Sequence, residues 1–215
     1  MSKKLFIFDL DGTLLNAYPA IIESMNYTLR RLKYPQVEPI EIIRAVGYGN
    51  YGLLKMFVKE EDVSAAKEIY REHHQNNLRG KVSLLPGALS LLQILRAKGK
   101  LLAVATNRPA DTALRLLQVT EIDHYFDRVL AGEEVKSPKP APDIILALLD
   151  YFQVSRKGTL YLGDMTIDAQ TGAAAGVETV IVTTGSSTRE EIEAANPDLI
   201  INSLEEFPSL RFGIK

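Results

Sequence analysis

The chain has 215 residues, of which 46% are hydrophobic and 24% charged, and its formal net charge is −2. This composition fits one globular domain, or one domain carrying a smaller inserted one. The small net charge gives no reason to expect nucleic acid or an acidic membrane as a partner, and the absence of cysteine excludes disulfides, thiolate metal sites and cysteine nucleophiles.

The first apolar run, residues 4–8, follows the N-terminal residues directly. It is far too short for a signal peptide or a membrane span, and Asp9 ends it. We therefore expect a cytoplasmic protein without a membrane partner.

Short apolar runs recur along the chain and alternate with helical patterns. Runs that are apolar at every position predict strands buried on both faces, as in a parallel sheet between helices. The predicted strands are residues 4–8, 101–105, 128–131, 159–162, 179–182 and 198–201, and the predicted helices between them are residues 88–97, 110–118, 142–152, 169–175 and 188–195. This alternation predicts an α/β fold with a doubly wound, Rossmann-like parallel sheet.

Residues 17–81 break the alternation, because they show helical periodicity and no strand pattern. The helical candidates in this stretch are residues 21–32, 42–46, 53–58 and 65–78. We therefore predict a helical cap domain over residues 16–83, inserted into an α/β core formed by residues 1–15 and 84–215. Leu85-Pro86-Gly87 is the expected return hinge, since proline and glycine mark element boundaries.

Two carboxylates, Asp9 and Asp11, follow the first predicted strand and are separated by one residue. On an extended chain such residues project to the same side, about 6.5–7 Å apart. They lie at the carboxyl end of the strand, where open α/β sheets bind ligands. Gly12 permits a sharp turn that frees backbone amides to approach an anion. An Asp-Gly turn alone indicates nothing more than a turn, whereas the second carboxylate favours a site.

The sequence Asp9-Leu10-Asp11-Gly12-Thr13 resembles the first motif of the haloacid dehalogenase-like hydrolase superfamily. Three further motifs follow in the family's order and extend the resemblance over nearly the whole chain. They are Thr106-Asn107 after the second strand, Lys139 in the run Ser137 to Asp143, and Gly163-Asp164-Met165-Thr166-Ile167-Asp168 after the fourth strand. Each later motif is weak alone, and the four in order are specific.

The resemblance implies a function for each matched residue. Asp9 would be the nucleophile and Asp11 the general acid and base, while Thr106 and Lys139 would contact the phosphoryl group. Gly12, Thr13 and Asn107 would help to bind the substrate. Mg²⁺ would be held by the side chains of Asp9 and Asp164 and by the carbonyl of Asp11, with Asp168 acting through water or from behind the ligands.

Electrostatics independently favours a cation among these residues. A phosphate ester with a charge near −2 would meet four carboxylates, Asp9, Asp11, Asp164 and Asp168, which would repel it or become protonated. A hard divalent cation resolves this conflict, and carboxylate oxygens are the ligands that Mg²⁺ prefers. Mg²⁺ and Lys139 together would offset three of the four negative charges.

Alternatives remain open for several residues. Lys136 competes with Lys139, although the prolines beside Lys139 restrict its backbone and favour it. Thr106 also suits a cap for the helix that begins near Pro109, and Asp168 suits the first turn of a helix. His73 and His74 are adjacent on a predicted helix, face different directions, and are interpreted as ordinary surface histidines.

Within the superfamily the chain looks most like phosphoglycolate phosphatases with a helical cap, whose partner is a small phosphate ester. The nearest rival is a phosphotransferase like beta-phosphoglucomutase, but such relatives usually carry Asp-Gly-Val where this chain has Gly12-Thr13. A dehalogenase is disfavoured because Asp11 is present. A receiver-type phospho-switch shares the acids, Mg²⁺ and lysine, yet it lacks an inserted cap. The sequence leaves open the ester, a monomer or homodimer, and the cap residues that face the substrate, with these candidates: Tyr18, Tyr48, Asn50, Tyr51 and Lys55.

Overall fold

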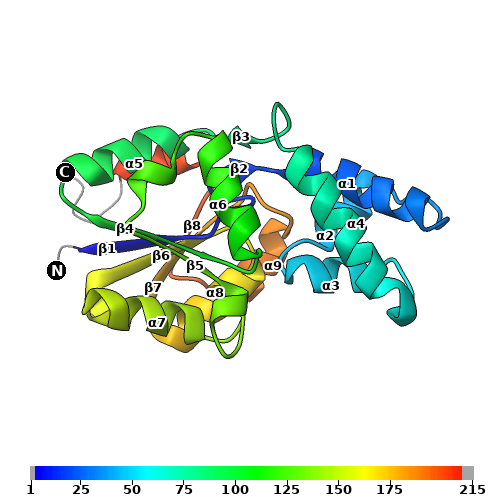
Figure 1. The fold of residues 1–215 in the computed structure, drawn as a ribbon. Coiled ribbons are helices and arrows are strands. Elements are labelled where there is room, and N and C mark those ends of the chain that lie inside the picture. The colour runs from blue at the N-terminus through cyan, green and yellow to red at the C-terminus, as the bar shows by residue number, and fades with distance from the viewer. Residues whose placement is uncertain (1–2, 210–215) are drawn as a thin grey trace.

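A six-stranded parallel sheet lies at the centre of the computed structural model, which describes residues 3–209 (Figure 1). The strand order is β5-β4-β1-β6-β7-β8. The strands are β1 (Leu5–Phe8), β4 (Leu101–Thr106), β5 (Arg128–Ala131), β6 (Thr159–Gly163), β7 (Glu178–Val182) and β8 (Leu199–Ile201). In this register Phe8 pairs with Val104 on one side and with Leu162 on the other, so β1, β4 and β6 end at the same edge of the sheet.

Helices cover both faces of the sheet (Figure 1). Successive side chains of β1 point to opposite faces, and all four are buried because each face is covered. Phe6 and Phe8 belong to the apolar cluster that includes α5 and α6, whereas Leu5 and Ile7 belong to the cluster of α7. The helices of this part are α5 (Ala88–Ala97), α6 (Ala110–Val119), α7 (Asp143–Phe152), α8 (Thr166–Ala175) and α9 (Arg189–Ala194), with short 3₁₀ helices η2 (Asp123–Tyr125), η3 (Gly132–Glu134), η4 (Arg156–Gly158) and η5 (Leu204–Ser209). The predicted α/β fold with a parallel sheet is confirmed.

Helices also fill the stretch between β1 and α5, which lies beyond the carboxyl edge of the sheet (Figure 1). They are α1 (Tyr18–Arg31), α2 (Pro39–Arg44), α3 (Gly49–Lys55), the 3₁₀ helix η1 (Glu60–Asp62) and α4 (Val63–Asn76). The antiparallel ribbon of β2 (Leu15–Asn16) and β3 (Ser83–Leu84) was not predicted. Both predicted domain boundaries fall within this ribbon, and the division into two domains stays a prediction.

The longest described helices, α1 and α4, have 14 residues each and pack against one another. Each is amphipathic, with Met25 and Leu29 buried on α1 and Ala66 and Tyr70 buried on α4. Within residues 3–209, no helix combines the length and the apolar character that a membrane crossing requires.

Candidate active site

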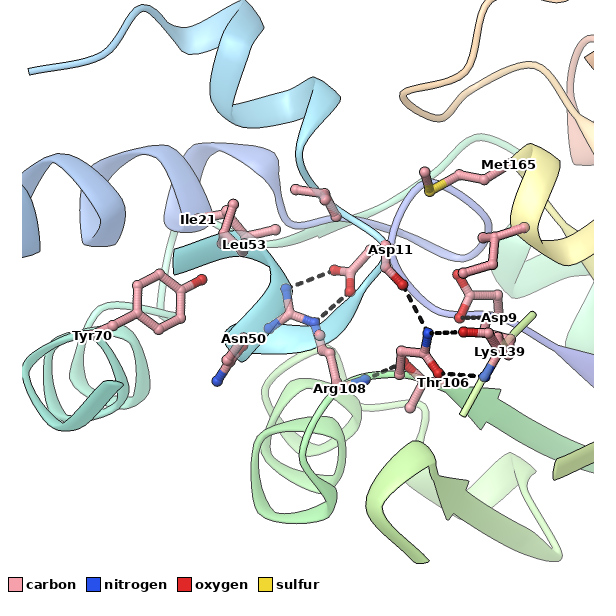
Figure 2. A pocket seen from close by; sticks show the side chains of 15 residues that line it. Asp9, Asp11, Ile21, Asn50, Leu53, Tyr70, Thr106, Arg108, Lys139 and Met165 are labelled. Carbon is pink, nitrogen blue, oxygen red and sulfur yellow. Dashed lines mark hydrogen bonds and ion pairs between the residues drawn. The ribbon is translucent and has the colours of Figure 1, made fainter. Parts of the chain in front are cut away.

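The sequence-predicted residues converge where β1, β4 and β6 end (Figure 2). Asp9 follows β1 directly, and its backbone amide donates to the carbonyl of Leu162 at 2.9 Å. Thr106 is the last residue of β4, and Asp164 is the first residue after β6. Because parallel strands end at one edge, motifs about 100 and 150 residues apart meet in a single pocket.

Lys139 is buried at the centre of this group. Its Nζ lies 2.8 Å from Asp9 Oδ1 and 2.7 Å from Asp168 Oδ1, and it donates to the Tyr161 hydroxyl at 3.1 Å. Burial opposes the ammonium charge, yet the carboxylates of Asp168 and Asp9 raise the pKa of Lys139 well above its ordinary value. The competing Lys136 is exposed, so Lys139 and not Lys136 is the lysine that lines the pocket.

Three buried carboxylates, those of Asp9, Asp164 and Asp168, each offer an oxygen within 4.8 Å of the others. Burial raises the pKa of Asp9 to about 7, with Lys139 lowering it and Asp168 raising it. Burial also raises the pKa of Asp164 well above its usual range, and the charges of Asp168 and Asp9 add to this effect. The protein alone therefore disfavours the ionised forms of Asp9 and Asp164, and a bound cation would offset this cost.

One oxygen of Asp164 has the properties of an unfilled ligand. Thr13 donates to Asp164 Oδ1 at 2.8 Å, but the buried Oδ2 has no hydrogen-bond partner among the described residues. A side chain at Gly12 or at Gly185 would overlap this carboxylate, so both positions keep the space beside it clear. Gly12 also has a φ of 82°, which other residues rarely adopt. An all-oxygen, negatively charged set with one orphaned oxygen fits a hard divalent cation such as Mg²⁺.

Asp168 is held entirely by the protein. Oδ1 accepts from Lys139 and, at 2.6 Å, from the Tyr161 hydroxyl, while Oδ2 accepts from the backbone amides of Asp164 and Met165 at 3.2 and 3.1 Å. The residue therefore caps the start of α8, as its position in the first helical turn suggests, and it also orients Lys139. Both oxygens of Asp168 thus have hydrogen-bond partners, whereas Asp164 Oδ2 has none among the described residues.

The carboxylate of Asp11 points away from this cluster and pairs with Arg108. Arg108 Nη2 donates to Asp11 Oδ1 at 2.8 Å and Nε donates to Oδ2, so the pair is bidentate, and both side chains are buried (Figure 2). Arg108 Nη1 lies 2.9 Å from His74 Nε2. The sequence analysis missed Arg108, and its position next to the second motif was the one available signal.

The interpretation of His74 as an ordinary surface histidine was wrong. His74 is buried against Arg108 and stacks on Tyr70, with ring centroids 5.1 Å apart. His73 is partly buried and stacks on Tyr27 at 4.0 Å. Helical periodicity alone gave no sign of this, because the inner face of α4 is set by its packing against α1 and the loop after β4.

The predicted substrate-binding residues divide into those that line the pocket and those that do not. Of these, Thr106, Asn107 and Lys139 line it together with Asp9 and Asp11, whereas Gly12 and Thr13 do not. Thr106 Oγ1 accepts from the amide of Arg108 at 3.1 Å, which makes a local turn rather than a cap on α6.

The Asn107 side chain connects the loop after β4 to Gly47 of the cap and to the loop of Lys139. Its Nδ2 donates to the carbonyls of Gly47 and Lys139 at 2.9 and 3.1 Å, and its Oδ1 accepts from the amide of Lys139 at 3.0 Å. Because its side-chain groups are engaged with backbone, this residue holds the loop of Lys139 and the cap in register.

The cap closes the pocket with residues that are mostly apolar. The cap residues that line it are Ile21, Val46, Gly47, Gly49, Asn50, Leu53 and Tyr70. Among the candidates left open by the sequence, Asn50 is in this lining. Tyr48, Tyr51 and Lys55 are exposed, and Tyr51 and Lys55 contact Glu60 outside the pocket.

Comparisons with known proteins agree with this arrangement. Residues 6–182 match the family described as haloacid dehalogenase-like hydrolase. A phosphoglycolate phosphatase of Haemophilus influenzae is 31% identical, with 96% of this chain and 97% of the relative covered. One of Pasteurella multocida is 29% identical, with 94% and 96% covered. A crystal structure described as a predicted phosphoglycolate phosphatase from Haemophilus somnus 129pt has a TM-score of 0.91 and 27% identity, and it covers 97% of this chain and 98% of that one. The chain belongs to the haloacid dehalogenase-like hydrolase family.

Proposed function

We propose that the protein is a Mg²⁺-dependent phosphatase that hydrolyses a small phosphate monoester of the phosphoglycolate type. The observation that carries the proposal is the position of Asp9. Its carboxylate lies against the ammonium of Lys139 and within the cluster of Asp164 and Asp168, while Asp11 lines the same pocket. Transfer of a phosphoryl group requires a nucleophile, a second carboxylate for proton transfer and positive charge beside the transferring group.

In the proposed mechanism Asp9 attacks the phosphorus atom in line with the ester bond. The P–O bond to the alcohol breaks, an aspartyl phosphate forms, and Asp11 gives its proton to the departing oxygen. Asp11 then takes a proton from the water that attacks the aspartyl phosphate, which releases inorganic phosphate and restores Asp9. The same carboxyl group therefore serves as acid in the first half and as base in the second.

The remaining residues stabilise charge and exclude water. Lys139 neutralises negative charge on the transferring group, and the Thr106 hydroxyl and neighbouring amides orient the oxygens. Asp9, Asp164 and the carbonyl of Asp11 would hold Mg²⁺, with Asp168 behind them, and the ion when bound supplies further positive charge beside the phosphoryl group. The apolar cap lining keeps bulk water from the aspartyl phosphate.

The substrate class rests on the relatives and on the pocket. The relatives compared above are named phosphoglycolate phosphatases. The pocket carries the positive charges of Lys139 and Arg108, which suits a small ester with more than one anionic group. A cytoplasmic location and a monomeric or homodimeric state stay predictions from the sequence.

A panel of phosphate esters tests the proposal. The purified protein is incubated with Mg²⁺ and each of 2-phosphoglycolate, sugar phosphates, a nucleotide, pyrophosphate and p-nitrophenyl phosphate, and release of inorganic phosphate is measured. We expect the highest kcat/KM with 2-phosphoglycolate. No release of phosphate from any ester would overturn the proposed phosphatase, and a clear preference for another ester would overturn the proposed substrate class.

A further inference from the structure

Arg108 is a buried cation in the pocket that the mechanism above does not use. It is 6% exposed, lines the pocket, and forms an ion pair with Asp11. Lys139, the other cation in the lining, is engaged by Asp9 and Asp168 and is assigned to the phosphoryl group. Arg108 is therefore the side chain in this lining with positive charge to offer to a second anionic group.

The cap holds Arg108 without neutralising it. Arg108 Nη1 donates to His74 Nε2, so the His74 proton is on Nδ1, which lies 3.2 Å from the Ser24 hydroxyl. The Ser24 hydroxyl in turn lies 3.1 Å from His73 Nδ1. Burial, with the charge of Arg108 adding to it, lowers the pKa of His74 to about 3, so this partner is uncharged at neutral pH. The guanidinium is fixed by a neutral acceptor, and Asp11 is its one ion-pair partner among residues 3–209.

The pairing with Asp11 conflicts with the role of Asp11 as the proton donor. Both carboxylate oxygens accept hydrogen bonds from Arg108, so neither is free to contact the leaving group while the pair is intact. Asp11 has to separate from Arg108 before it can act on the ester. Separation that left the buried guanidinium unpaired would be costly, whereas replacement of one carboxylate by another would preserve the bidentate pair.

The short separation between the leaving oxygen and the carboxylate of 2-phosphoglycolate would put the substrate carboxylate next to Arg108. The general acid has to contact the leaving oxygen, and in 2-phosphoglycolate the carboxylate carbon is two bonds from that oxygen. A side chain that contacts the Asp11 carboxylate is therefore adjacent to the substrate carboxylate. The planar fork of arginine matches a carboxylate in the same geometry that it now shows with Asp11.

We propose that Arg108 is the specificity-determining residue that recognises a carboxylate on the substrate, and that it exchanges Asp11 for this carboxylate when the substrate binds. This inference rests on the proposed phosphatase function. A phosphate ester with a carboxylate releases Asp11 for proton transfer, whereas a neutral alkyl ester leaves Asp11 paired. Selection of the substrate and activation of the general acid are then one event.

The test compares 2-phosphoglycolate with ethyl phosphate, which has a methyl group in place of the carboxylate. The readout is the ratio of kcat/KM for the two esters in the wild type and in Arg108→Gln, which keeps a planar polar group but lacks the charge. We expect the ratio to fall 10–100-fold in the variant. A ratio within 2-fold of the wild type would overturn the inference, because Arg108 would then act as a general clamp between core and cap.

Arg96→Gln is the matched control. Arg96 also contacts both carboxylate oxygens of an aspartate, with Nη1 at 2.9 and 2.8 Å from those of Asp127, but this pair is only half-buried and is not in the pocket lining. The control should leave the ratio of kcat/KM unchanged. If the ratio fell as much in Arg96→Gln as in Arg108→Gln, the loss of an arginine–aspartate pair outside the pocket would be enough to change substrate preference, and the inference would be overturned.

A binding measurement separates failure of the inference from failure of the proposed function. Titration calorimetry on Asp9→Asn, with and without Arg108→Gln, measures the Kd of both esters without turnover. We expect 2-phosphoglycolate to bind at least 10-fold more tightly than ethyl phosphate to Asp9→Asn, and the difference to disappear in the double variant. Equal binding of the two esters to Asp9→Asn overturns the inference even if the double variant fails to fold. If the wild type hydrolyses no ester, the proposed function fails, and this measurement still decides the role of Arg108.

Discussion

Lys139 and Arg108 bring two buried positive charges into a pocket whose other charged lining residues are Asp9 and Asp11. Each cation contacts one of the two carboxylates of the first motif, Lys139 with Asp9 and Arg108 with Asp11. Buried ion pairs of this kind contribute little to stability on balance, but loss of one partner leaves a costly unpaired charge. At the scale of single residues, the proposed mechanism assigns the pair of Lys139 and Asp9 to the phosphoryl group and the pair of Arg108 and Asp11 to the leaving group.

Replacement of Lys139 by alanine should lower kcat/KM about 10²–10³-fold, the usual effect of losing one group that stabilises the developing charge. Because Lys139 acts on the phosphoryl group, 2-phosphoglycolate and p-nitrophenyl phosphate should be affected to a similar degree. Steady-state kinetics with both esters measures this. Lys136→Ala is the control, since Lys136 is exposed three residues away, and a loss confined to one ester would contradict the role assigned to Lys139.

His74 should make the protein less stable as the pH falls below neutrality. Burial lowers its pKa from 6.5 to about 3, so the unfolded chain gains a proton near pH 6.5 that the folded protein does not bind. The stability that His74 contributes is therefore present above pH 6.5 and is lost as the pH falls toward 3. Between pH 7 and pH 5 this amounts to about 2 kcal/mol.

Urea unfolding of the wild type and of His74→Gln at pH 7 and pH 5 measures this difference in the free energy of unfolding. Glutamine keeps a hydrogen-bonding group near Arg108 but does not titrate. We expect the wild type to lose about 2 kcal/mol more than the variant over this interval. Equal losses in the two proteins would contradict a buried, neutral His74.

At the scale of elements, α3 and α4 bring the cap's polar contacts to the site. Asn50 on α3 lines the pocket, whereas Lys55 at the other end of α3 pairs with Glu60 and is exposed. The two residues are five positions apart on one helix, which makes them a matched pair for testing whether the cap selects the substrate.

Asn50→Ala should reduce kcat/KM for 2-phosphoglycolate about 10-fold, equivalent to about 1.4 kcal/mol of transition-state binding. The effect on p-nitrophenyl phosphate should be much smaller, because that ester depends on the core motifs. Lys55→Ala should change neither. Equal loss with both esters in Asn50→Ala, with the fold retained, would contradict a cap that selects the substrate.

The strands of the sheet were predictable because each is apolar at nearly every position. A strand with one face in water would alternate apolar and polar residues instead. Cap helices were located less accurately: α3 begins at Gly49, four residues before the predicted start. Its first half contains Gly49 and Gly52, which weaken the helical pattern, and tertiary packing determines where the helix begins. The ribbon of β2 and β3 has two residues in each strand, too few to show a period.

The core motif residues were recognisable because their order along the chain is itself a signal. Arg108 and His74 have no such signal, since an arginine and a histidine 34 positions apart have no reason to meet until α4 packs beside the loop after β4. The pairing of Arg108 with Asp11, 97 positions away, likewise depends on β1 and β4 being neighbours in the sheet.

At the scale of the whole molecule, cap and core share one apolar cluster and several polar contacts. The cluster extends from Phe6 and Phe8 of β1 to Ile21 and Leu53 of the cap. Arg44 of α2 pairs with Glu191 of α9, with nitrogen-to-oxygen distances of 2.7 and 2.9 Å. Together with the contacts of Asn107 and His74, these interactions hold the cap over the carboxylate cluster. In this structure the cap therefore covers the pocket.

Removal of divalent metal should affect both activity and stability. We expect a chelator to abolish hydrolysis and Mg²⁺ to restore it, while Ca²⁺ inhibits because its larger coordination number engages both oxygens of Asp9. Binding to the cluster should also stabilise the folded state, by about 2.7 kcal/mol when Mg²⁺ is at 100 times its Kd. Thermal unfolding with and without Mg²⁺ measures this. Full activity in chelator, or an unchanged melting temperature, would contradict a metal at Asp9 and Asp164.

Direct detection of the phosphorylated enzyme tests the central claim. The wild type is mixed with a ³²P-labelled ester and Mg²⁺, quenched in acid within a turnover, and digested, and the labelled peptide is sequenced; Asp9→Asn is treated in parallel. We predict label on Asp9 in the wild type, and neither label nor turnover in the variant, whose circular dichroism should match the wild type. Turnover without label on Asp9, or substantial hydrolysis by Asp9→Asn, would contradict the phospho-aspartate mechanism.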